Sequence, residues 1–272
     1  MPQLQPLAGG GPCSRHYIGL WKGAGVAADS RRDGGRSALL WDVLREVVSA
    51  AAALNGRPEL DIIDVGGGTG GLAVPFAALG HHVTVVDPSP DALAAAKRRA
   101  AEAGAHLVAV QGEAAGLDGV AEPDSADLVI CHNVLEYVDS PADAMAAIAR
   151  VLRPSATVSV LAANAVAAVL HRALAGRFTE ARLLLDDGVG GTGGEAGLPR
   201  RFTLAGLTTL IEGAGLRPGQ VHGLRVFGGL VPGALLDGDA GAAEALRALE
   251  EAAASTPPLR DIATQLHVLG HR

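Results

Sequence analysis

The chain has 272 residues, of which 49% are hydrophobic and 19% charged, and its formal net charge is −7. This length and apolar content allow a full buried core, most simply as one elaborated domain. No apolar run reaches the roughly 18 residues that a membrane span requires, so we expect no membrane partner and a cytoplasmic location. The cysteines are Cys13 and Cys131 alone, which argues against a disulfide framework and a cysteine-based zinc site, and we expect no metal.

The acidic residues are concentrated in one part of the chain. Residues 57–140 contain 4 basic and 13 acidic residues, whereas residues 1–56 and 141–234 have net charges of +2 and +3. The mildly basic segments permit an anionic substrate, and they argue only weakly for nucleic acid.

The first part of the chain predicts an arm followed by alternating elements. Residues 1–35 are rich in glycine, proline and arginine, so we expect a flexible arm or lid before a single domain that spans residues 36–272. Ser37 is expected to cap a helix that runs to about Leu54, because apolar residues follow it at helical spacing. Strands are then expected over residues 60–65, 83–86, 107–110, 126–131 and 157–162, and helices over residues 70–79, 89–103 and 141–151. This alternation predicts parallel strands with helices on both faces of the sheet.

The second part predicts an insertion and a closing pair of strands. We expect an inserted helical segment over residues 164–185, a glycine-rich flexible loop over 186–197, and a helix capped by Thr203 that ends near Gly213. Residues 216–226 and 262–269 are expected to pair as antiparallel strands, with a solvated outer helix over 240–254 between them. The predicted fold class is α/β: a Rossmann-like, doubly wound, mixed seven-stranded sheet with helices on both faces, an antiparallel C-terminal strand pair and an insertion at about residues 164–200.

A glycine-rich turn follows the first predicted strand. Its sequence is Asp64-Val-Gly66-Gly67-Gly68-Thr-Gly70-Gly71. Glycines let the backbone approach a ligand that a Cβ would exclude, and Asp87 at the tip of the next strand can accept both hydroxyls of a ribose. In the alternative, the glycines only form a tight turn and Asp87 caps the helix that begins near Ser89.

The glycine spacing also fits the Gly-x-Gly-x-x-Gly pattern of dinucleotide enzymes, at Gly66, Gly68 and Gly71. Three details favour S-adenosylmethionine instead: Asp64 before the glycines, the Val-Gly-Gly-Gly-Thr-Gly string, and the later segment Asp127-Leu-Val-Ile-Cys-His-Asn-Val-Leu-Glu136. The whole pattern resembles class I methyltransferases. Like Asp64, residues Gly66, Gly67 and Gly68 are therefore expected to bind this cofactor.

Further candidates follow the third and fourth predicted strands. Glu113 stands where such enzymes place a side chain and backbone amides around the adenine, although it can equally be a surface acid. His132 lies just past the fourth strand, at the edge where ligands of open α/β sheets collect, and can contact the cofactor or the methyl acceptor. In the alternative, His132 is a structural histidine bound to a neighbouring carbonyl. Glu136 is expected to be helical and near the same edge.

Two arginines are candidates for binding anions. Arg36 precedes the Ser37 helix and can reach the carboxylate of the cofactor, which suits a bidentate guanidinium, or it is a plain surface residue. Arg225 lies in an otherwise apolar strand, which is costly unless the charge is paired, so it can face an anionic acceptor.

A more specific resemblance is carried by segments spread over roughly residues 15–270. They are Gly35-Arg36-Ser-Ala-Leu-Leu-Trp41-Asp-Val-Leu, the glycine turn, Cys131-His132-Asn-Val-Leu-Glu136-Tyr137, Val151-Leu-Arg-Pro154, Gly223-Leu-Arg225-Val-Phe227 and Leu266-His-Val. Together they resemble the tRNA 5-carboxymethoxyuridine methyltransferases, which methylate the carboxyl group of a modified wobble uridine. The resemblance implies that the cofactor contacts Arg36, Gly67, Gly68, Asp87, backbone near Ala114 and Ala115, and His132. The lysine-rich stretch of that family is replaced here by a glycine-rich segment that ends in Arg200 and Arg201.

The predicted reaction is an in-line displacement at the sulfonium methyl group. A carboxylate acceptor is already ionised and needs no general base, so Arg225 can bind it, whereas a phenol or alcohol would require His132 as a base. The acceptor is expected to be tRNA or an anionic small molecule. Alternatives are a small-molecule O- or N-methyltransferase of secondary metabolism and a non-catalytic protein that binds the cofactor. A nicotinamide-dependent reductase is disfavoured, because neither Lys22 nor Lys97 has a tyrosine four residues before it.

Overall fold

The computed structural model describes residues 30–186, 199–231 and 241–272, with side chains from Ala38 onward. Of the predicted arm over residues 1–35, residues 1–29 lie outside this range, and residues 30–35 are helical, which corrects that part of the prediction. Of the predicted loop over residues 186–197, residues 187–197 lie outside the range and Asp186 ends a helix. The described elements are α2 (Ser30–Asn55), β1 (Asp61–Val65), α3 (Ala73–Ala78), β2 (His82–Asp87), α4 (Pro90–Glu102), β3 (Val108–Gln111), η1 (Ala114–Gly119), β4 (Ala126–His132), α5 (Pro141–Val151), β5 (Leu152–Ala163), α6 (Ala165–Leu174), α7 (Phe178–Asp186), α8 (Leu204–Gly213), β6 (Arg217–Leu224), α10 (Ala242–Ala254), η2 (Leu259–Ile262) and β7 (Gln265–His271).

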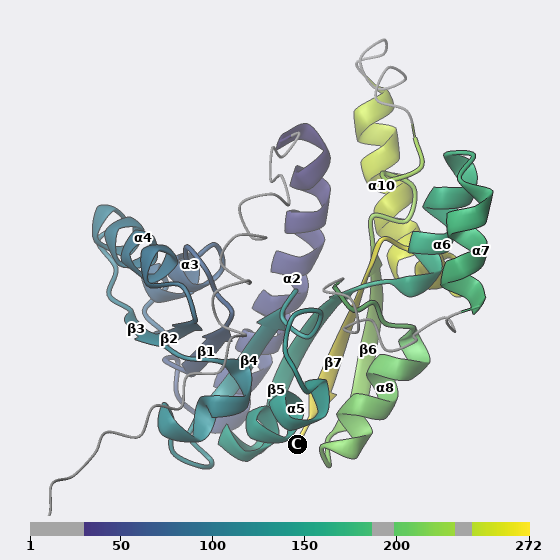
Figure 1. Ribbon diagram of the computed structural model, residues 1–272. Coiled ribbons are helices and arrows are strands. Elements are labelled where there is room, and N and C mark those ends of the chain that lie inside the picture. Colours follow the sequence, from purple (N-terminus) through teal and green to yellow (C-terminus); the bar gives the residue numbers. More distant parts are fainter. Residues whose placement is uncertain (1–29, 187–198, 232–240) are drawn as a thin grey trace, which may run out of the picture.

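The seven strands form one mixed sheet in the order β3-β2-β1-β4-β5-β7-β6 (Figure 1). The first five are parallel, and β7 runs antiparallel to both β5 and β6. The strand order reverses between β1 and β4, which is where open α/β sheets bind their ligands. Both the predicted fold class and the antiparallel C-terminal pair are confirmed.

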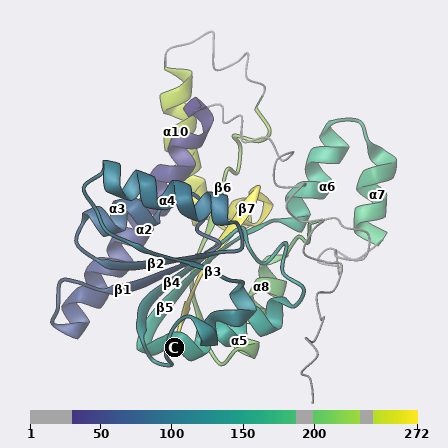
Figure 2. The same ribbon diagram turned by 60° about the vertical axis from the view of Figure 1, so that its left-hand side comes forward.

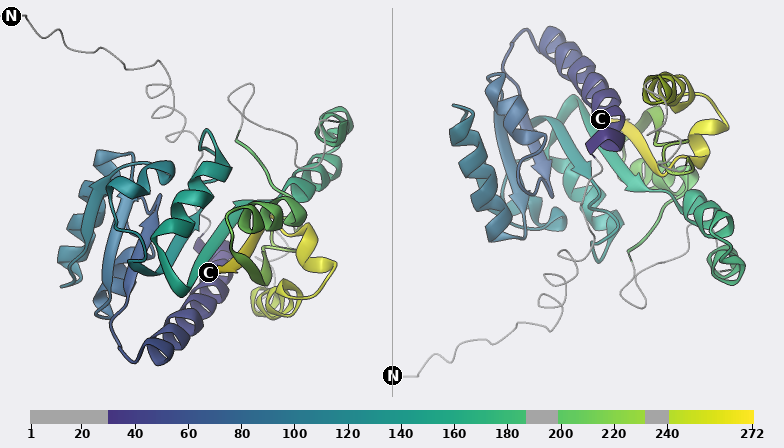
Figure 3. Two further views of the ribbon diagram at one scale, coloured as in Figure 1. Left: turned by 90° about the horizontal axis from the view of Figure 1, so that it is seen from below. Right: turned by 90° about the horizontal axis from the view of Figure 1, so that it is seen from above.

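Alternating side chains of each strand pack on two helical layers (Figure 3). On one face, Leu128 and Ile130 of β4 pack with residues of α2, α3 and α4. On the other face, Val129 and Cys131 pack with residues of η1, α5 and α8. The period of two in the strands and the amphipathic helices thus produce one three-layered core.

Side-chain caps fix where several helices begin. Ser89 accepts a hydrogen bond from the N–H of Ala92 at 3.2 Å, and Thr203 accepts one from the N–H of Gly206 at 3.0 Å. Asn164 caps α6 in the same way and begins the predicted insertion, whose helices α6 and α7 project beyond the sheet (Figure 2). The predicted cap at Thr203 and the predicted helix start near Ser89 are therefore confirmed, and the capping residue of α4 is Ser89 itself.

Some predicted boundaries were wrong. Helix α2 begins at Ser30, so Ser37 lies inside it instead of capping it; arginines favour the helix, and two glycines cost it only about 1 kcal/mol each. Helix α3 begins at Ala73 and not at Gly70, because positive φ angles at Gly68 and Gly70 hold the preceding turn open. Strand β5 begins at Leu152, five residues early, since it follows α5 without a loop.

Helix α10 packs against the rest of the protein more than predicted. Most of its side chains are exposed, as expected, but Ala253 and Ala254 are buried and Glu250 binds the segment after β6. Among the residues that the structure describes, no helix is long and apolar enough to cross a membrane.

Candidate functional site

The turn between β1 and α3 leaves no space for side chains at two of its glycines. Gly66 and Gly70 have φ angles of +66° and +78°, which residues with a Cβ rarely adopt. A Cβ on Gly66 would collide with the side chain of Val134, and one on Gly67 would lie 2.6 Å from the carboxylate of Asp64. Close packing against Val134 and Asp64 therefore requires glycine at these two positions.

Asp87 closes β2 beside this turn and is buried. One carboxylate oxygen accepts the N–H of Gly68 at 2.9 Å, and the other accepts the N–H of Ser89 at 2.8 Å. A carboxylate has about four acceptor positions, so two remain for the hydroxyls of a ribose. The alternative role of Asp87, as a cap of the helix that begins near Ser89, is also partly supported. Its carboxylate accepts the N–H of Ser89, the residue that precedes α4.

Asp64 is the second buried acid at this edge. Burial, followed by the charge of Asp87, raises the pKa of Asp64 to about 7, and a hydrogen bond from the N–H of Ala73 opposes that rise. The two acids thus place carboxyl groups beside the glycine turn, which suits a ligand that carries a positive charge and hydroxyl donors.

The predicted adenine segment lies next to Asp87. The N–H of Gly112 donates to the carbonyl of Asp87 at 3.3 Å, which brings the end of β3 beside that residue. Glu113 is exposed, Ala114 is buried and Ala115 is exposed, at the start of η1. Contacts of these three residues with an adenine remain predictions.

His132 is half-buried and is the last residue of β4. The strand was predicted to end at residue 131, so it is one residue longer than expected and includes His132. Its Nε2 lies 2.8 Å from Oγ of Ser159 in β5. The next residue, Asn133, has a φ angle of +55°, and its side-chain oxygen accepts a hydrogen bond from Gln265 at the start of β7. The carboxyl edge is therefore tied together across three strands.

Glu136 lies in the turn after β4 and not in a helix, which corrects the prediction. It is buried, its Oε1 accepts the N–H of Ala163 at 2.7 Å, and its Oε2 has no hydrogen-bond partner among the described residues. Burial raises the pKa of Glu136 to about 7, against hydrogen bonds from Ala163 and its own backbone and the charge of Arg201. The sequence analysis did not identify this acid as buried.

Arg225 follows β6 and does not lie within a strand, which corrects that prediction. It has a φ angle of +59° because Glu250 of α10 holds the chain beyond it: the carboxylate accepts N–H groups from Val226, Phe227 and Gly228. The Nε of Arg225 is buried without a hydrogen-bond partner among the described residues. Because β6 is parallel to β5, Arg225 stands at the same edge as His132.

Two further arginines lie near Arg225, and we call the three the arginine cluster: Arg172, Arg201 and Arg225. Burial and then the charges of Arg225 and Arg172 lower the pKa of His171, so both guanidinium groups act electrostatically on that ring. Burial and then Arg172 also lower the pKa of Arg201. The arginines of the cluster come from α6, the segment before α8 and the end of β6. Acids accompany two of them, because Oε2 of Glu180 lies 3.4 Å from Nε of Arg172 and Glu136 acts electrostatically on Arg201.

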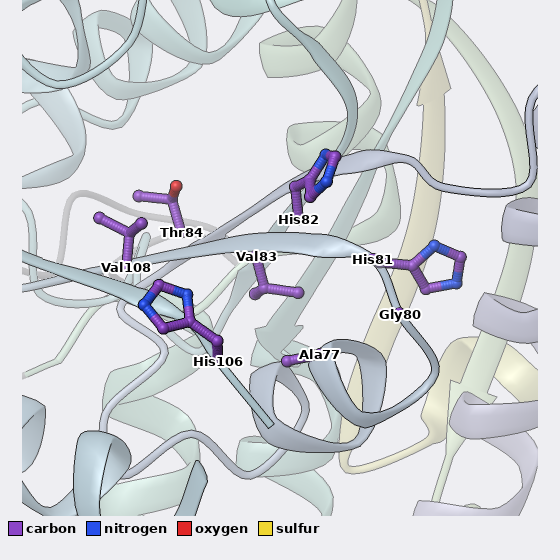
Figure 4. A pocket seen from close by; sticks show the side chains of 8 residues that line it. All are labelled: Ala77, Gly80, His81, His82, Val83, Thr84, His106 and Val108. Atoms are coloured by element: carbon purple, nitrogen blue, oxygen red, sulfur yellow. The ribbon is translucent and has the colours of Figure 1, made fainter. Parts of the chain in front are cut away.

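The backbone of Arg36 lies in α2, but its side chain is outside the described residues, so its contact with a cofactor remains a prediction. A surface hollow beside His82 and His106 lies at the other end of β2, and its histidine rings do not converge (Figure 4). Within the described part of the chain, no group of three histidine, cysteine or acidic residues is placed to hold a metal.

Known proteins share part of this sequence and the fold of the chain. Residues 63–160 match the family model described as a methyltransferase domain. The chain is 31% identical to the tRNA 5-carboxymethoxyuridine methyltransferase of Escherichia coli over 144 residues, covering 53% of this chain and 54% of that protein. Over these residues the chain is similar to class I S-adenosylmethionine-dependent methyltransferases.

Other relatives of this methyltransferase act on different molecules. It is 38% identical over 109 residues to the ubiquinone biosynthesis O-methyltransferase of Burkholderia orbicola, covering 39% of this chain and 44% of that protein. The chain thus spans about half the length of the curated relatives it matches. These matches leave the acceptor open.

Solved structures show the same fold over nearly the whole methyltransferase. Magnesium protoporphyrin IX methyltransferase from Synechocystis, with bound S-adenosylhomocysteine, has a TM-score of 0.55 at 16% identity and covers 95% of both chains. An S-adenosylmethionine-dependent methyltransferase from Mesorhizobium loti has a TM-score of 0.53 at 20% identity, covering 89% of this chain and 100% of the other.

The residues at this edge of the sheet fit S-adenosylmethionine. The glycine turn provides bare backbone, Asp87 retains acceptor positions for a ribose, and Asp64 supplies a second acid near a positively charged ligand. The sequence missed Arg172, Ser159 and the burial of Glu136, because these depend on which strand ends meet. A polar residue inside an otherwise apolar strand, as at Ser159, was the one available signal.

Proposed function

We propose that this protein transfers the methyl group of S-adenosylmethionine to a negatively charged acceptor, most specifically a carboxylate such as that of 5-carboxymethoxyuridine in tRNA. The observation that carries this proposal is the arginine cluster. The three arginines lie on segments that follow β5 and β6, they act electrostatically on shared neighbours, and the Nε of Arg225 is buried without a hydrogen-bond partner among the described residues. A buried, unpartnered guanidinium donor is costly, and a carboxylate would satisfy it in a bidentate geometry.

The two sides of the edge have complementary charges. Asp64 and Asp87 form the cofactor side, and the arginine cluster forms the acceptor side. S-adenosylmethionine supplies a methyl group that is already activated by its positive sulfur. The protein therefore has to align an acceptor oxygen with that methyl group and exclude water, which needs position more than acid–base chemistry.

Glu136 and Tyr137 limit where an anion can bind. Glu136 acts electrostatically on Arg201, and its carboxyl has a pKa near neutrality. A protonated Glu136 would leave the charge of Arg201 available to the acceptor, whereas an ionised one would compete for it. Because an ionised Glu136 competes for Arg201, we propose that the acceptor binds nearer to Arg225 than to Arg201.

The tRNA acceptor is supported by the Escherichia coli relative, but one contact weighs against it. Arg200, one of two basic residues where that family has a lysine-rich stretch, donates to the carbonyl groups of Val138 and Asp139. The guanidinium of Arg200 thus binds backbone of the protein itself instead of RNA phosphates. Contacts with phosphates supply most sequence-independent affinity for RNA. A small-molecule acceptor is therefore the second candidate, favoured by this contact and by the similarity to ubiquinone biosynthesis O-methyltransferases.

The test measures which acceptor receives label and what bond forms. The protein is incubated with methyl-labelled S-adenosylmethionine and three acceptor pools: tRNA that carries 5-carboxymethoxyuridine, unmodified tRNA transcript, and a small-molecule acid extract. Methyl esters are released by mild alkali, whereas methyl ethers and N-methyl groups are not. Alkali-labile label in the modified tRNA alone supports the specific proposal, and alkali-labile label in the extract alone supports a small carboxylate. Alkali-stable label would refute a carboxylate acceptor.

A matched pair of variants assigns the role of the cluster. Arg225→Gln is expected to reduce transfer at limiting acceptor at least tenfold. Arg182→Gln removes an arginine that is 81% exposed on α7 and should leave transfer unchanged. Binding of S-adenosylhomocysteine, measured by calorimetry, should be equal in the two variants, because the arginine cluster lies on the acceptor side.

A further inference from the structure

Four polar side chains form a continuous chain across neighbouring strands of the sheet. Nε2 of His132 lies 2.8 Å from Oγ of Ser159, that oxygen lies 2.8 Å from Nε2 of His267, and Nδ1 of His267 lies 3.2 Å from Nδ1 of His222. The residues come from β4, β5, β7 and β6, which are adjacent in that order (Figure 1). We call these four residues the histidine chain.

The middle of the histidine chain is sealed from solvent. Ser159 and His267 have no exposed surface, and they lie on the face of the sheet that α2 covers. The ring of His267 stacks on that of His222, with centroids 5.4 Å apart, and meets the ring of His132 edge-on at 5.9 Å. The rings are thus held by packing as well as by hydrogen bonds, and none can turn without disturbing its neighbours.

Burial keeps the central ring neutral. Burial, and then the neighbouring His132 and His222, lower the pKa of His267 well below its ordinary value. A neutral imidazole has one N–H donor and one acceptor nitrogen, and a serine hydroxyl has one proton to donate. Each link of the chain therefore needs one donor and one acceptor, and the direction of one link determines the next.

Two arrangements satisfy every link of the neutral chain and also use the hydroxyl proton of Ser159 within it. In the first, His222 donates to His267, His267 donates to Ser159, and Ser159 donates to Nε2 of His132, whose proton is then on Nδ1. In the second, all three links reverse, and the proton of His132 is on Nε2. Conversion from the first to the second moves one proton across each link, while one proton leaves Nδ1 of His132 and one binds Nε2 of His222, so the charge balances.

We propose that Ser159 and His267 are positioning residues that couple the tautomer of His132, at the methyl-transfer edge, to the protonation state of His222. The proposal rests on the proposed function in one respect, the placement of His132 beside the reacting groups. When His222 binds a second proton, both of its nitrogens carry hydrogen, and it can only donate to His267. That enforces the first arrangement, in which His132 carries its proton on Nδ1.

The charges that act on His222 come from two packed elements. Burial and then Arg260 of η2 lower the pKa of His222, and Glu46 of α2 raises it. With His267 of β7, these are the titratable and charged groups that influence His222 in the part of the chain that the structure describes. The second proton therefore binds below the ordinary range of histidine.

The consequence for methyl transfer concerns an acceptor oxygen. A proton on Nδ1 makes that nitrogen a hydrogen-bond donor, which suits an oxygen that is already negatively charged. A proton on Nε2 makes Nδ1 an acceptor, which suits a hydroxyl that must lose its proton. The histidine chain thus provides a way to select between two classes of oxygen nucleophile through His222, which lies three strands away from His132.

The test reads the tautomers directly by two-bond proton–nitrogen NMR of protein labelled with 15N-histidine. Each ring is assigned with a single histidine-to-glutamine variant. At pH 8 we expect His267 to have the tautomer opposite to that of both His132 and His222. As the pH falls through the titration of His222, His132 should shift fully to the Nδ1–H form. A His267 ring that shares the tautomer of either neighbour, or a His132 tautomer unaffected by His222, would overturn the proposal.

Two serine variants separate coupling from simple packing. Ser159→Ala removes the hydroxyl and should make the tautomer of His132 independent of pH over the titration of His222. Ser159→Thr keeps the hydroxyl and should restore the dependence. His106→Gln, at an exposed position on the amino edge, is the matched control and should change neither. Equal behaviour of the alanine and threonine variants would contradict the relay.

Activity is read separately, so that the two proposals can fail separately. In an active enzyme, Ser159→Ala should alter the pH profile of kcat/KM for methyl transfer, with the affinity for S-adenosylhomocysteine unchanged. Alternating tautomers in a protein that transfers no methyl group would overturn the proposed function and still support the coupling. An active enzyme without alternating tautomers would overturn the coupling and still support the proposed function.

Discussion

Replacement of Glu136 by glutamine should make the protein more stable at alkaline pH. The wild-type carboxyl is buried, and its Oε2 has no hydrogen-bond partner among the described residues. Glutamine has the same shape, keeps an oxygen that can accept the N–H of Ala163, and carries no charge. The substitution therefore removes the cost of burying an ionised group and little else.

The magnitude follows from the pKa of Glu136, which rises from its ordinary 4.5 to about 7 in the folded protein, chiefly through burial. Below pH 4.5 the carboxyl is protonated whether the chain is folded or unfolded. Between pH 4.5 and about 7, only the unfolded chain releases the proton, so the free energy of unfolding falls as the pH rises. One pH unit corresponds to about 1.4 kcal/mol, so the total loss is roughly 3 kcal/mol, complete above pH 7.

Urea denaturation followed by circular dichroism, at intervals from pH 4.5 to 8.5, measures this effect. The difference in unfolding free energy between Glu136→Gln and wild type should increase by roughly 3 kcal/mol across that range. Asp64 also has a raised pKa of about 7, but it is present in both proteins and cancels in the difference. Glu251→Gln, on an exposed side chain of α10, is the control and should show no such trend. A difference that stays constant with pH would refute the reasoning.

Three other substitutions test the cofactor side and the core. Asp87→Asn should weaken binding of S-adenosylhomocysteine by about 1 to 3 kcal/mol in calorimetry, whereas Asp91→Asn in the exposed first turn of α4 should not; equal affinities would refute the ribose role. Gly66→Ala should lower the free energy of unfolding by at least about 1 kcal/mol, because its φ is positive and its Cβ would meet a side chain, while Gly71→Ala has open space and should be neutral in thermal denaturation. Asp127→Asn should cost about 3 to 5 kcal/mol in urea denaturation, because this buried carboxylate pairs with two arginines; a loss below about 1 kcal/mol would contradict that ion-pair role.

The fold was largely predictable because its signals are local. Apolar runs of strand length, the caps at Ser89 and Thr203, and the alternation of strands with helices each follow from a few neighbouring residues. The start of α2 was not predictable from Ser37, since capping residues also occur inside helices when the flanking residues favour the helix. Local signals thus identify the elements better than their ends.

The site was predictable on the cofactor side and only partly on the acceptor side. Gly66 of the glycine turn and Asp87 are 21 positions apart in the sequence, so their proximity follows from one strand–helix–strand unit. The arginine cluster joins Arg172 to Arg225, and Glu136 is buried only because the end of β5 lies against its turn. Such contacts depend on strand order and on the path of the insertion, which no periodicity in the sequence encodes.

The kinetic effect of the arginine cluster separates the two acceptor classes. When a carboxylate attacks the sulfonium methyl group, negative charge on the acceptor decreases in the transition state, so an arginine binds the ground state at least as strongly as the transition state. Arg225→Gln should then raise KM for the acceptor with kcat changed less than about threefold, because uniform binding energy affects KM alone. If the acceptor is a neutral hydroxyl that loses its proton during transfer, negative charge develops and the same substitution should lower kcat. Steady-state kinetics with the acceptor that the labelling experiment identifies will distinguish these cases, and a loss confined to kcat would refute the binding of a preformed carboxylate by Arg225.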